Sequence, residues 1–330
     1  QMAGIFGAAL ALTVPEIAEK LGGQVVFFAT PAEEYGEIEF KNQLREQGKI
    51  RYGGGKCELI RTGAFDDIDL CLAHHIQPGD EIQVGSGTGN GFVSKVIRYL
   101  GKAAHAAGAP DKGVNALSAA SLGLQALGLN RETFRDEDCV RVHPIITKGG
   151  NLVNVIPDEI VIETLVRAKT IEAFTDAAKK TDRSFQAGAV AMGAKVEITT
   201  LPGYLPTLAE QALPELKRAA ELAAPEVPVR EAAGHSGGST DVGDVQHLMP
   251  VYTFNTGGVK GGLHQINFEV TNEEEAYIDT AKMFALAAYG LLKEKAARSK
   301  ELVKNYKPVF KDSAEYTKFM EQFDSKEVLD

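Results

Sequence analysis

The 330-residue sequence predicts an α/β protein with a mostly parallel sheet, helices on both faces of that sheet, and a second module inserted into it. Apolar strand-like runs alternate with helix-like segments near the N-terminus, which is typical of a parallel α/β layer. Between residues 91 and 207 the order becomes strand–helix–strand–strand–helix–strand, that of a split βαβ (ferredoxin-like) α+β module. The α/β pattern then returns. We therefore expect one interrupted domain, although two neighbouring domains are the simpler alternative.

The first part of the interrupted domain, residues 1–90, holds two predicted strands. The apolar residues 2–14 predict a buried helix, and the chain opens inside it without a cap, which we interpret as missing upstream sequence. Residues 24–30 (QVVFFAT) and 67–73 (DIDLCLA) predict buried strands. Between these strands, residues 36–52 are highly charged and are interpreted as a solvated excursion.

The inserted module and the second part of the interrupted domain follow in order. The module (91–207) predicts strands at 92–99, 140–147, 159–168 and 195–201 and helices at 114–127 and 171–192. The second part (208–297) predicts a helix to about residue 224, a strand at 251–255 and a long last helix with Glu273 to Glu275 in its first turn. The tail, 298–330, is charged and partly helical, and no function is evident for it.

Composition limits the classes of function. The formal net charge of −10 argues against a nucleic-acid partner, because phosphate contacts need a basic face. No apolar run approaches the ~18 residues of a membrane span. The three cysteines, Cys57, Cys71 and Cys139, form no Cys-x-x-Cys pair, so a reducing, cytoplasmic location is expected.

Two adjacent carboxylates, Glu33 and Glu34, follow the first predicted strand. Ligands of parallel α/β sheets bind beyond the carboxyl ends of the strands. Adjacent side chains diverge there, so one carboxylate can bind a metal while the other accepts a proton. Taken alone, such a pair is more often a solvated surface feature. Its place after a buried strand favours the catalytic interpretation.

Histidines supply further candidate ligands. His74 and His75 end the second predicted strand, and His264 lies in the glycine-rich segment GGLH. Each can also be a core or loop residue, because most histidines bind nothing. One Glu and two His suit zinc or manganese, but no close spacing makes the set specific.

Two segments rich in small residues are also candidates. His105 lies in GKAAHAA, where its ring can reach outward, although a locally satisfied histidine is equally consistent. Residues 234–241 (GHSGGSTD) can present backbone N–H groups to an anion. They do not form a Gly-x-Ser-x-Gly elbow, so a serine amidase using Ser236 or Ser239 is a weaker alternative.

Taken in order over residues 1–297, these segments resemble one family. The motifs are PAEE, GGGK, GAFDDID and AHHIQPG, then GKAAHAAGAPDKGVNAL and GGNLVNVIPDEIVIETLVR, then HSGGSTDVGDV and GGLHQINF. They are similar to those of the metallopeptidase and amidohydrolase family that includes aminoacylase, carnosinase, auxin-conjugate hydrolases and p-aminobenzoyl-glutamate hydrolase. GSTDVGDV is most similar to the branch of p-aminobenzoyl-glutamate hydrolase and the β-alanyl-lysine dipeptidase-like proteins.

The resemblance implies a metal site. Glu33 is similar to the family's general base and Glu34 to a metal ligand. His75 matches the strand-end ligand, because the following IQPG resembles the family's His-x-x-Pro, and His74 fits less well. His264 matches the last ligand.

The resemblance also implies a substrate site and a homodimer through the inserted lid. His105 resembles a lid histidine that reaches the partner subunit's site and stabilises the oxyanion. Asn154 and Arg167 resemble lid residues near the substrate, and Arg167 can pair with a carboxylate. Gly238 and Ser239 are the substrate-binding candidates of the glycine-rich loop.

The sequence departs from the family's pattern in two ways. The branch carries a His-x-Cys-Gly-His-Asn stretch, with two more ligands, just before the position of Gln1. Residues 36–52 also intervene where the family has little chain.

The activity implied is hydrolysis of a small amide: an N-acyl amino acid, an aminobenzoyl-glutamate-like compound or a dipeptide. Two divalent metals, zinc or manganese, would activate a water, and Glu33 would act as general base. The alternative is a non-catalytic peptide-binding or partner-binding member, because this chain holds three of the family's ligands rather than five.

Overall fold

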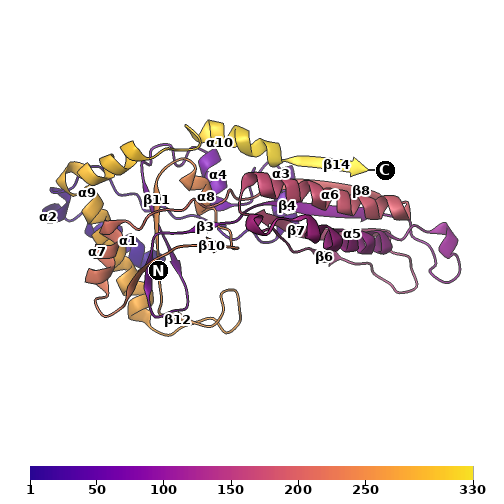
Figure 1. Ribbon diagram of the computed structural model, residues 1–330, viewed down its shortest axis with the longest axis horizontal. Coiled ribbons are helices and arrows are strands. Elements are labelled where there is room, and N and C mark those ends of the chain that lie inside the picture. The colour runs from indigo at the N-terminus through magenta and orange to yellow at the C-terminus, as the bar shows by residue number, and fades with distance from the viewer. Residues whose placement is uncertain (330) are drawn as a thin grey trace.

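The computed structural model describes residues 1–329, which form two larger sheets, each with its own helices, and two small two-stranded sheets (Figure 1). The first sheet has the order β1-β11-β2-β9. Its strands are β1 (Cys71–Ile76), β2 (Ile82–Val84), β9 (Val229–Glu231) and β11 (Val251–Thr256). β1 pairs with β11 and β2 with β9 in parallel, whereas β11 and β2 are antiparallel. The expected α/β class is confirmed, but the sheet is mixed.

Helices cover both faces of the first sheet, as the alternation of side chains along β1 requires. Leu72 packs into a cluster with α7 (Pro214–Ala223) and α9 (Thr280–Asn305). Cys71 and Ala73 point the other way, into the cluster of α4 (Gly55–Arg61) and α8 (Val242–Gln246).

The second sheet is antiparallel, with the order β14-β8-β4-β7-β5 and β6 beside β7. Its strands are β4 (Gly91–Leu100), β5 (Arg141–Val142), β6 (Ile145–Lys148), β7 (Glu159–Ala168), β8 (Lys195–Pro202) and β14 (Ser325–Leu329). The helices α5 (Ala116–Asn130) and α6 (Ile171–Met192) pack against it and against each other. Gly188 permits that contact, because a Cβ there would lie 2.2 Å from the carbonyl oxygen of Ala119.

The charged segment 36–52 is not only a solvated excursion. It forms α3 (Ile38–Glu46), which contacts β4 and buries Ile38. Two of its charged side chains form ion pairs with other elements: Glu39 reaches Arg98 of β4 at 3.3 Å, and Arg45, only 10% exposed, pairs with Asp324 at 2.7 Å. Because α5 and α6 cover one face of β4 and α3 with its neighbours covers the other, β4 is buried on both faces.

Two expectations near the N-terminus are wrong. Residues 2–14 do form a helix, α1 (Met2–Ala11), but Phe6 and Leu10 are about half exposed. Residues 24–30 are extended and pair with no strand among the described residues. A strand needs a neighbour for its backbone N–H and C=O groups, and composition alone does not supply one.

The tail belongs to the second sheet. After α9, which is interrupted by non-helical residues at 293–296, α10 (Ser313–Met320) leads into β14, which pairs with β8 (Figure 1). The remaining short elements are α2 (Pro15–Ala18), β3 (Thr88–Gly89), η1 (Pro110–Lys112), η2 (Arg131–Thr133), η3 (Asp136–Asp138), β10 (His235–Ser236), β12 (Val259–Lys260), β13 (Glu269–Val270), η4 (Glu274–Asp279) and η5 (Glu321–Phe323).

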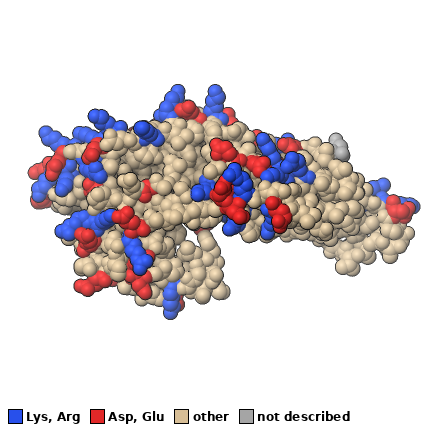
Figure 2. Space-filling model, in the orientation of Figure 1, with Lys and Arg blue, Asp and Glu red and all other residues tan. Residues whose placement is uncertain are grey.

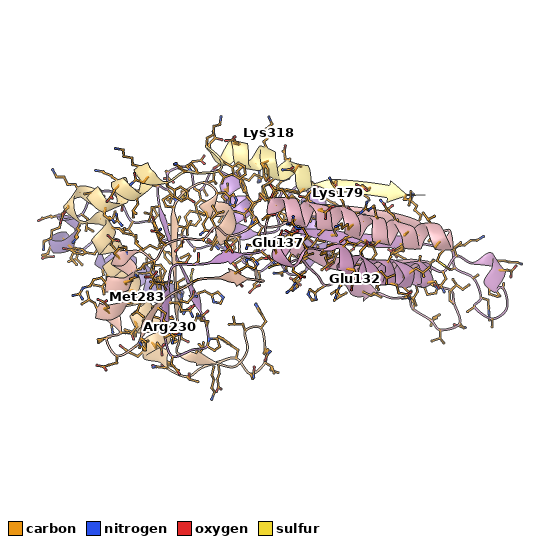
Figure 3. The ribbon with its side chains drawn as sticks, in the orientation of Figure 1. Glu132, Glu137, Lys179, Arg230, Met283 and Lys318 are labelled. Carbon is orange, nitrogen blue, oxygen red and sulfur yellow. The ribbon has the colours of Figure 1, made fainter. Side chains whose placement is uncertain are left out.

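The surface carries both signs of charge. Lys and Arg are mixed with Asp and Glu on the face shown in Figure 2, which has no continuous basic stripe. In Figure 3, Met283 and Arg230 mark the end of the molecule that holds the first sheet. Glu132 and Lys179 mark the second unit, which consists of the second sheet with α5 and α6. Within residues 1–329, no helix is long and apolar enough to cross a membrane.

Candidate active site

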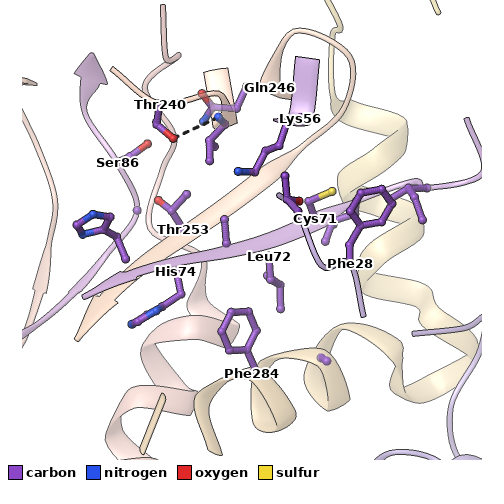
Figure 4. A pocket seen from close by; sticks show the side chains of 18 of the residues that line it. Phe28, Lys56, Cys71, Leu72, His74, Ser86, Thr240, Gln246, Thr253 and Phe284 are labelled. Atoms are coloured by element: carbon purple, nitrogen blue, oxygen red, sulfur yellow. Dashed lines mark hydrogen bonds between the residues drawn. The ribbon is translucent and has the colours of Figure 1, made fainter. Parts of the chain in front are cut away.

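A cavity of about 1380 Å³ runs along β1, between the extended segment 24–28, α9 and the loop 234–240. Lys56 and Thr240 lie on one side of β1, and the side chains of His74 and Phe284 lie on its other side (Figure 4). The polar part of the lining includes Glu33, His75 and His264. The cavity therefore brings together three of the predicted candidates, Glu33, His75 and His264, from distant parts of the chain.

Glu33 is held at both its backbone and its side chain. Its carboxylate Oε1 accepts a hydrogen bond of 2.7 Å from the hydroxyl of Thr240. Its carbonyl oxygen accepts one from the hydroxyl of Tyr204. The preceding residue, Ala32, has a φ of +52°, a conformation that costs a non-glycine residue energy. Gly55 lets α4 approach this turn, since a Cβ there would lie 1.7 Å from the carbonyl oxygen of Pro31.

Glu34 and His264 meet across 230 residues of sequence. Oε1 of Glu34 lies 3.7 Å from Nε2 of His264, and about three quarters of each side chain is exposed. His264 has a φ of +61°. Lys41 donates a 2.7 Å hydrogen bond to the carbonyl oxygen of Glu34. The pair thus points into open space from two irregular segments.

The two histidines of β1 have different surroundings. His74 is half-buried, its Nε2 lies 2.8 Å from the Thr256 hydroxyl, and its ring packs on Phe254 and Phe284. Burial lowers the pKa of His74 to about 3, so its ring is neutral. His75 is exposed and lines the cavity. Of the two histidines, His75 is therefore the one whose side chain is open to the cavity.

The Glu34–His264 pair fits a divalent metal. Two ligands at 2.0–2.1 Å from a tetrahedral zinc lie roughly 3.3 Å apart, close to the 3.7 Å observed. Within residues 1–329, however, no group of three or more His, Cys, Asp or Glu side chains is close enough to hold a metal. His75 lines the same cavity without joining the pair.

Arg167 joins the second unit to the glycine-rich loop. Its guanidinium donates a 3.1 Å hydrogen bond to the hydroxyl of Ser239 and lies over the ring of Phe92. Burial lowers the pKa of Arg167. Gly238 and Ser239 line the cavity. In the described chain, neither Ser239 nor Ser236 is hydrogen-bonded to a histidine or carboxylate, which disfavours a serine nucleophile.

His105 and Asn154 lie together, away from these residues. The two segments pair through a bridge between His105 and Val155, and the amide of Ala106 donates to the carbonyl oxygen of Asn154. His105 follows β4 in the chain and Asn154 precedes β7, so both lie near the end of β4 that is opposite the cavity. Ten residues of strand span roughly 33 Å, so His105 is far from Glu33 of the same chain.

The sequence alone missed the buried supports of the site. Asp241 is fully buried, and its carboxylate accepts hydrogen bonds from the backbone N–H of Lys56 at 2.9 Å and from the Lys56 ammonium at 2.6 Å. Burial raises the pKa of Asp241, and the Lys56 charge opposes that change. The signal was present in the motifs GGGK and GSTD, whose Lys and Asp had no assigned role.

Comparisons with known proteins agree with the family resemblance. Mouse Xaa-Arg dipeptidase is 28% identical over 312 residues, a match that covers 92% of this chain but only 65% of that protein. One of the subunits of Escherichia coli p-aminobenzoyl-glutamate hydrolase is 31% identical over 140 residues, covering 41% of this chain and 27% of that protein. The chain therefore spans about two thirds of the length of the first of these relatives.

Solved structures share the fold. An aminobenzoyl-glutamate utilization protein from Klebsiella pneumoniae superposes with a TM-score of 0.59 at 20% identity, covering 88% of this chain and 66% of that one. A dinuclear metal-binding peptidase of the M20 family from Bacillus subtilis gives 0.57 at 23%, covering 88% and 70%. The model of peptidase family M20/M25/M40 matches residues 1–289. This chain belongs to peptidase family M20/M25/M40.

Proposed function

We propose that this chain is the larger part of a metal-dependent amidohydrolase that cleaves an amide bond in an N-acyl amino acid, an aminobenzoyl-glutamate-like compound or a dipeptide. The observation that carries the proposal is the approach of Glu34, the neighbour of Glu33 in the chain, to His264 at 3.7 Å, where Glu33 and His264 line the same cavity. The names of the relatives, an Xaa-Arg dipeptidase and a p-aminobenzoyl-glutamate hydrolase, support this class of substrate.

Glu34, His264 and His75 would hold metal. A divalent ion, zinc or manganese, polarises the amide carbonyl and makes water a stronger nucleophile when bound there. Glu33 would accept the proton of the attacking water and return it to the leaving amine. Arg167, with Ser239, would pair with the carboxylate of the substrate.

The distance of His105 from Glu33 supports a homodimer through the second unit. If His105 contributes to an oxyanion site, it must come from a partner subunit, as the family resemblance implies. The edge strand β6 offers a surface for that partner, since Ile145 and Ile146 are exposed in it.

Metal content and turnover test the proposal. The full-length protein that contains this chain would be loaded with zinc or manganese and assayed on p-aminobenzoyl-glutamate and a dipeptide panel. We expect Glu33→Gln to lower kcat by at least about a hundredfold, with metal content unchanged, and Glu34→Ala to lower metal content. Glu37→Gln is the matched control, because Glu37 is an exposed neighbour outside the cavity lining.

The second candidate function is binding without catalysis. It is favoured by one observation, namely that the described residues bring only two ligands into contact. A metal-free protein that cleaves none of the amides but still binds a dipeptide would establish this function in place of hydrolysis.

A further inference from the structure

The carboxylate of Glu33 has a defined orientation. The Thr240 hydroxyl is its hydrogen-bond donor, 2.7 Å from Oε1. The same hydroxyl oxygen lies 3.4 Å from the backbone N–H of Val242, which donates to it. Because that N–H approaches the oxygen's lone pair, the hydroxyl proton is directed to Glu33. One carboxylate oxygen is therefore engaged and the other, Oε2, is left to accept a proton.

Thr240 is itself fixed by the neighbouring Asp241. This carboxylate is fully buried, and both of its oxygens bond to Lys56 at the start of α4. A buried charge with this geometry resists displacement, because moving it would leave an unpaired charge in the interior. The Lys56–Asp241 ion pair thus anchors the loop that carries Thr240.

A second buried carboxylate, on α8, strengthens the anchor. Asp244 accepts a 2.8 Å hydrogen bond from the Tyr316 hydroxyl of α10 and others from the backbone N–H of Leu205. Both Asp244 and Tyr316 are fully buried. The loop before α8 is therefore tied to α4 through Asp241, and α8 itself is tied to the tail through Asp244.

We propose that Thr240 is a positioning residue for the general base: it holds Oε1 of Glu33 so that Oε2 takes the proton, and the Lys56–Asp241 ion pair holds Thr240 in place. This inference rests on the proposed hydrolase function. It assigns Thr240 a role through Glu33 and no contact with metal or substrate.

A double-mutant cycle tests the role. In the full-length, metal-loaded protein, kcat and KM would be measured on p-aminobenzoyl-glutamate, or on the dipeptide cleaved fastest, for Thr240→Val, Thr240→Ser, Glu33→Gln and the Thr240→Val/Glu33→Gln double variant. We expect Thr240→Val to lower kcat about tenfold, the worth of one hydrogen bond to a charged group, and to change KM by less than about twofold. Thr240→Ser retains the hydroxyl and should recover most of kcat. Metal content should be the same in all variants.

The cycle separates the two proposals. In the Glu33→Gln background, Thr240→Val should lower the residual rate no further. An equal loss in both backgrounds, or a Thr240→Ser variant as slow as Thr240→Val, would overturn the positioning role and leave the hydrolase function intact. A parent that cleaves nothing, or a Glu33→Gln variant with the parent's kcat, would overturn the hydrolase function. Should Thr240→Val melt early, Thr240→Ala removes the same hydroxyl with a smaller side chain.

Discussion

The two sheets of this chain are built from similarly apolar segments, yet they differ in how completely their strands are paired. Every residue of β4 pairs with β7 and most also pair with β8, and both faces of the strand are covered. Beside the first sheet, residues 24–30 are as β-branched and aromatic as a strand but pair with none in the described chain. Val25 and Val26 remain exposed there. Apolar composition selects a segment for burial, and a partner strand decides whether it becomes a strand.

The candidate site lies in the less regular of the two regions. Glu33 and His264 sit on segments without regular structure, next to or at residues with positive φ. The second unit instead provides a packed scaffold, and Arg167 near the end of its strand β7 is hydrogen-bonded to Ser239, which lines the cavity. Open space and irregular backbone suit binding, and the complete sheet suits positioning.

Core truncation should give the largest difference between the regions. Phe185 on α6 is fully buried, so Phe185→Ala should lower the free energy of unfolding by about 3–5 kcal/mol. Phe28 is partly exposed and stacked on Phe65, and its site is already open to the cavity. Phe28→Ala should therefore lower the free energy of unfolding by only about 1 kcal/mol. Urea unfolding of the two variants measures this, and equal losses would contradict the comparison.

Each region also contains one buried lysine–aspartate pair, with opposite asymmetry. In the second sheet, Lys95 is 1% exposed and Asp182 15%, whereas near the site Lys56 is 19% exposed and Asp241 0%. Removing the more exposed partner leaves the buried charge unpaired. We therefore expect Lys56→Met and Asp182→Asn to cost about 3 kcal/mol or more.

The reverse substitutions are the matched controls for these two variants. Asp241→Asn and Lys95→Met should each cost less than the substitution of its partner, since the charge that remains reaches water. If both lysine substitutions instead lower the free energy of unfolding more than both aspartate substitutions, the burial of the remaining partner does not determine the size of the loss. Thermal and urea unfolding of all four variants decides between these results.

Sequence reasoning succeeded where one local pattern fixed the element. β7, α6 and β8 begin at the predicted residues, because each is a long amphipathic or alternating run with a clear start, such as the N-cap Thr170 before α6. It failed where tertiary partners decide, as for residues 24–30 and for α3, whose one inward side chain, Ile38, is hidden among charges.

For the site, the order of the motifs predicted that Glu33, Glu34 and His264 belong to one site, and the structure brings Glu34 and His264 to within 3.7 Å. Lys56 and Asp241 stand in the motifs GGGK and GSTD, but their pairing was not predicted, because one sequence does not show that two residues 185 positions apart are in contact. Nor was the link from the tail to Asp244, since the tail shows no motif.

The effect that is smallest per pH unit is a dependence of stability on pH, which we follow at one buried carboxylate on the site side of the comparison. Burial raises the pKa of Asp244 to about 8, the hydrogen bond from Tyr316 opposes this change, and the charge of Asp241 adds to it. An unfolded aspartate titrates near pH 4, so between these values the folded protein holds a proton that the unfolded chain has lost. The protonated Asp244 contributes most at low pH, and its contribution falls by up to about 1.4 kcal/mol per pH unit as pH rises toward 8.

Asp244→Asn removes this proton and keeps an oxygen that can accept from Tyr316. Melting curves from pH 5 to 8 should therefore fall more steeply for the parent than for the variant. Of the groups that face Asp244, the Cys57 thiol and the Tyr316 hydroxyl stay neutral over this range, because burial raises the pKa of both. Asp241 titrates in the same sense and is present in both proteins, so the difference between the curves reports Asp244 together with its charge interaction with Asp241. Asp66→Asn, at an exposed carboxylate, is the control and should keep the parent's slope. Parallel curves for the parent and Asp244→Asn would mean that Asp244 is already ionised in the folded protein.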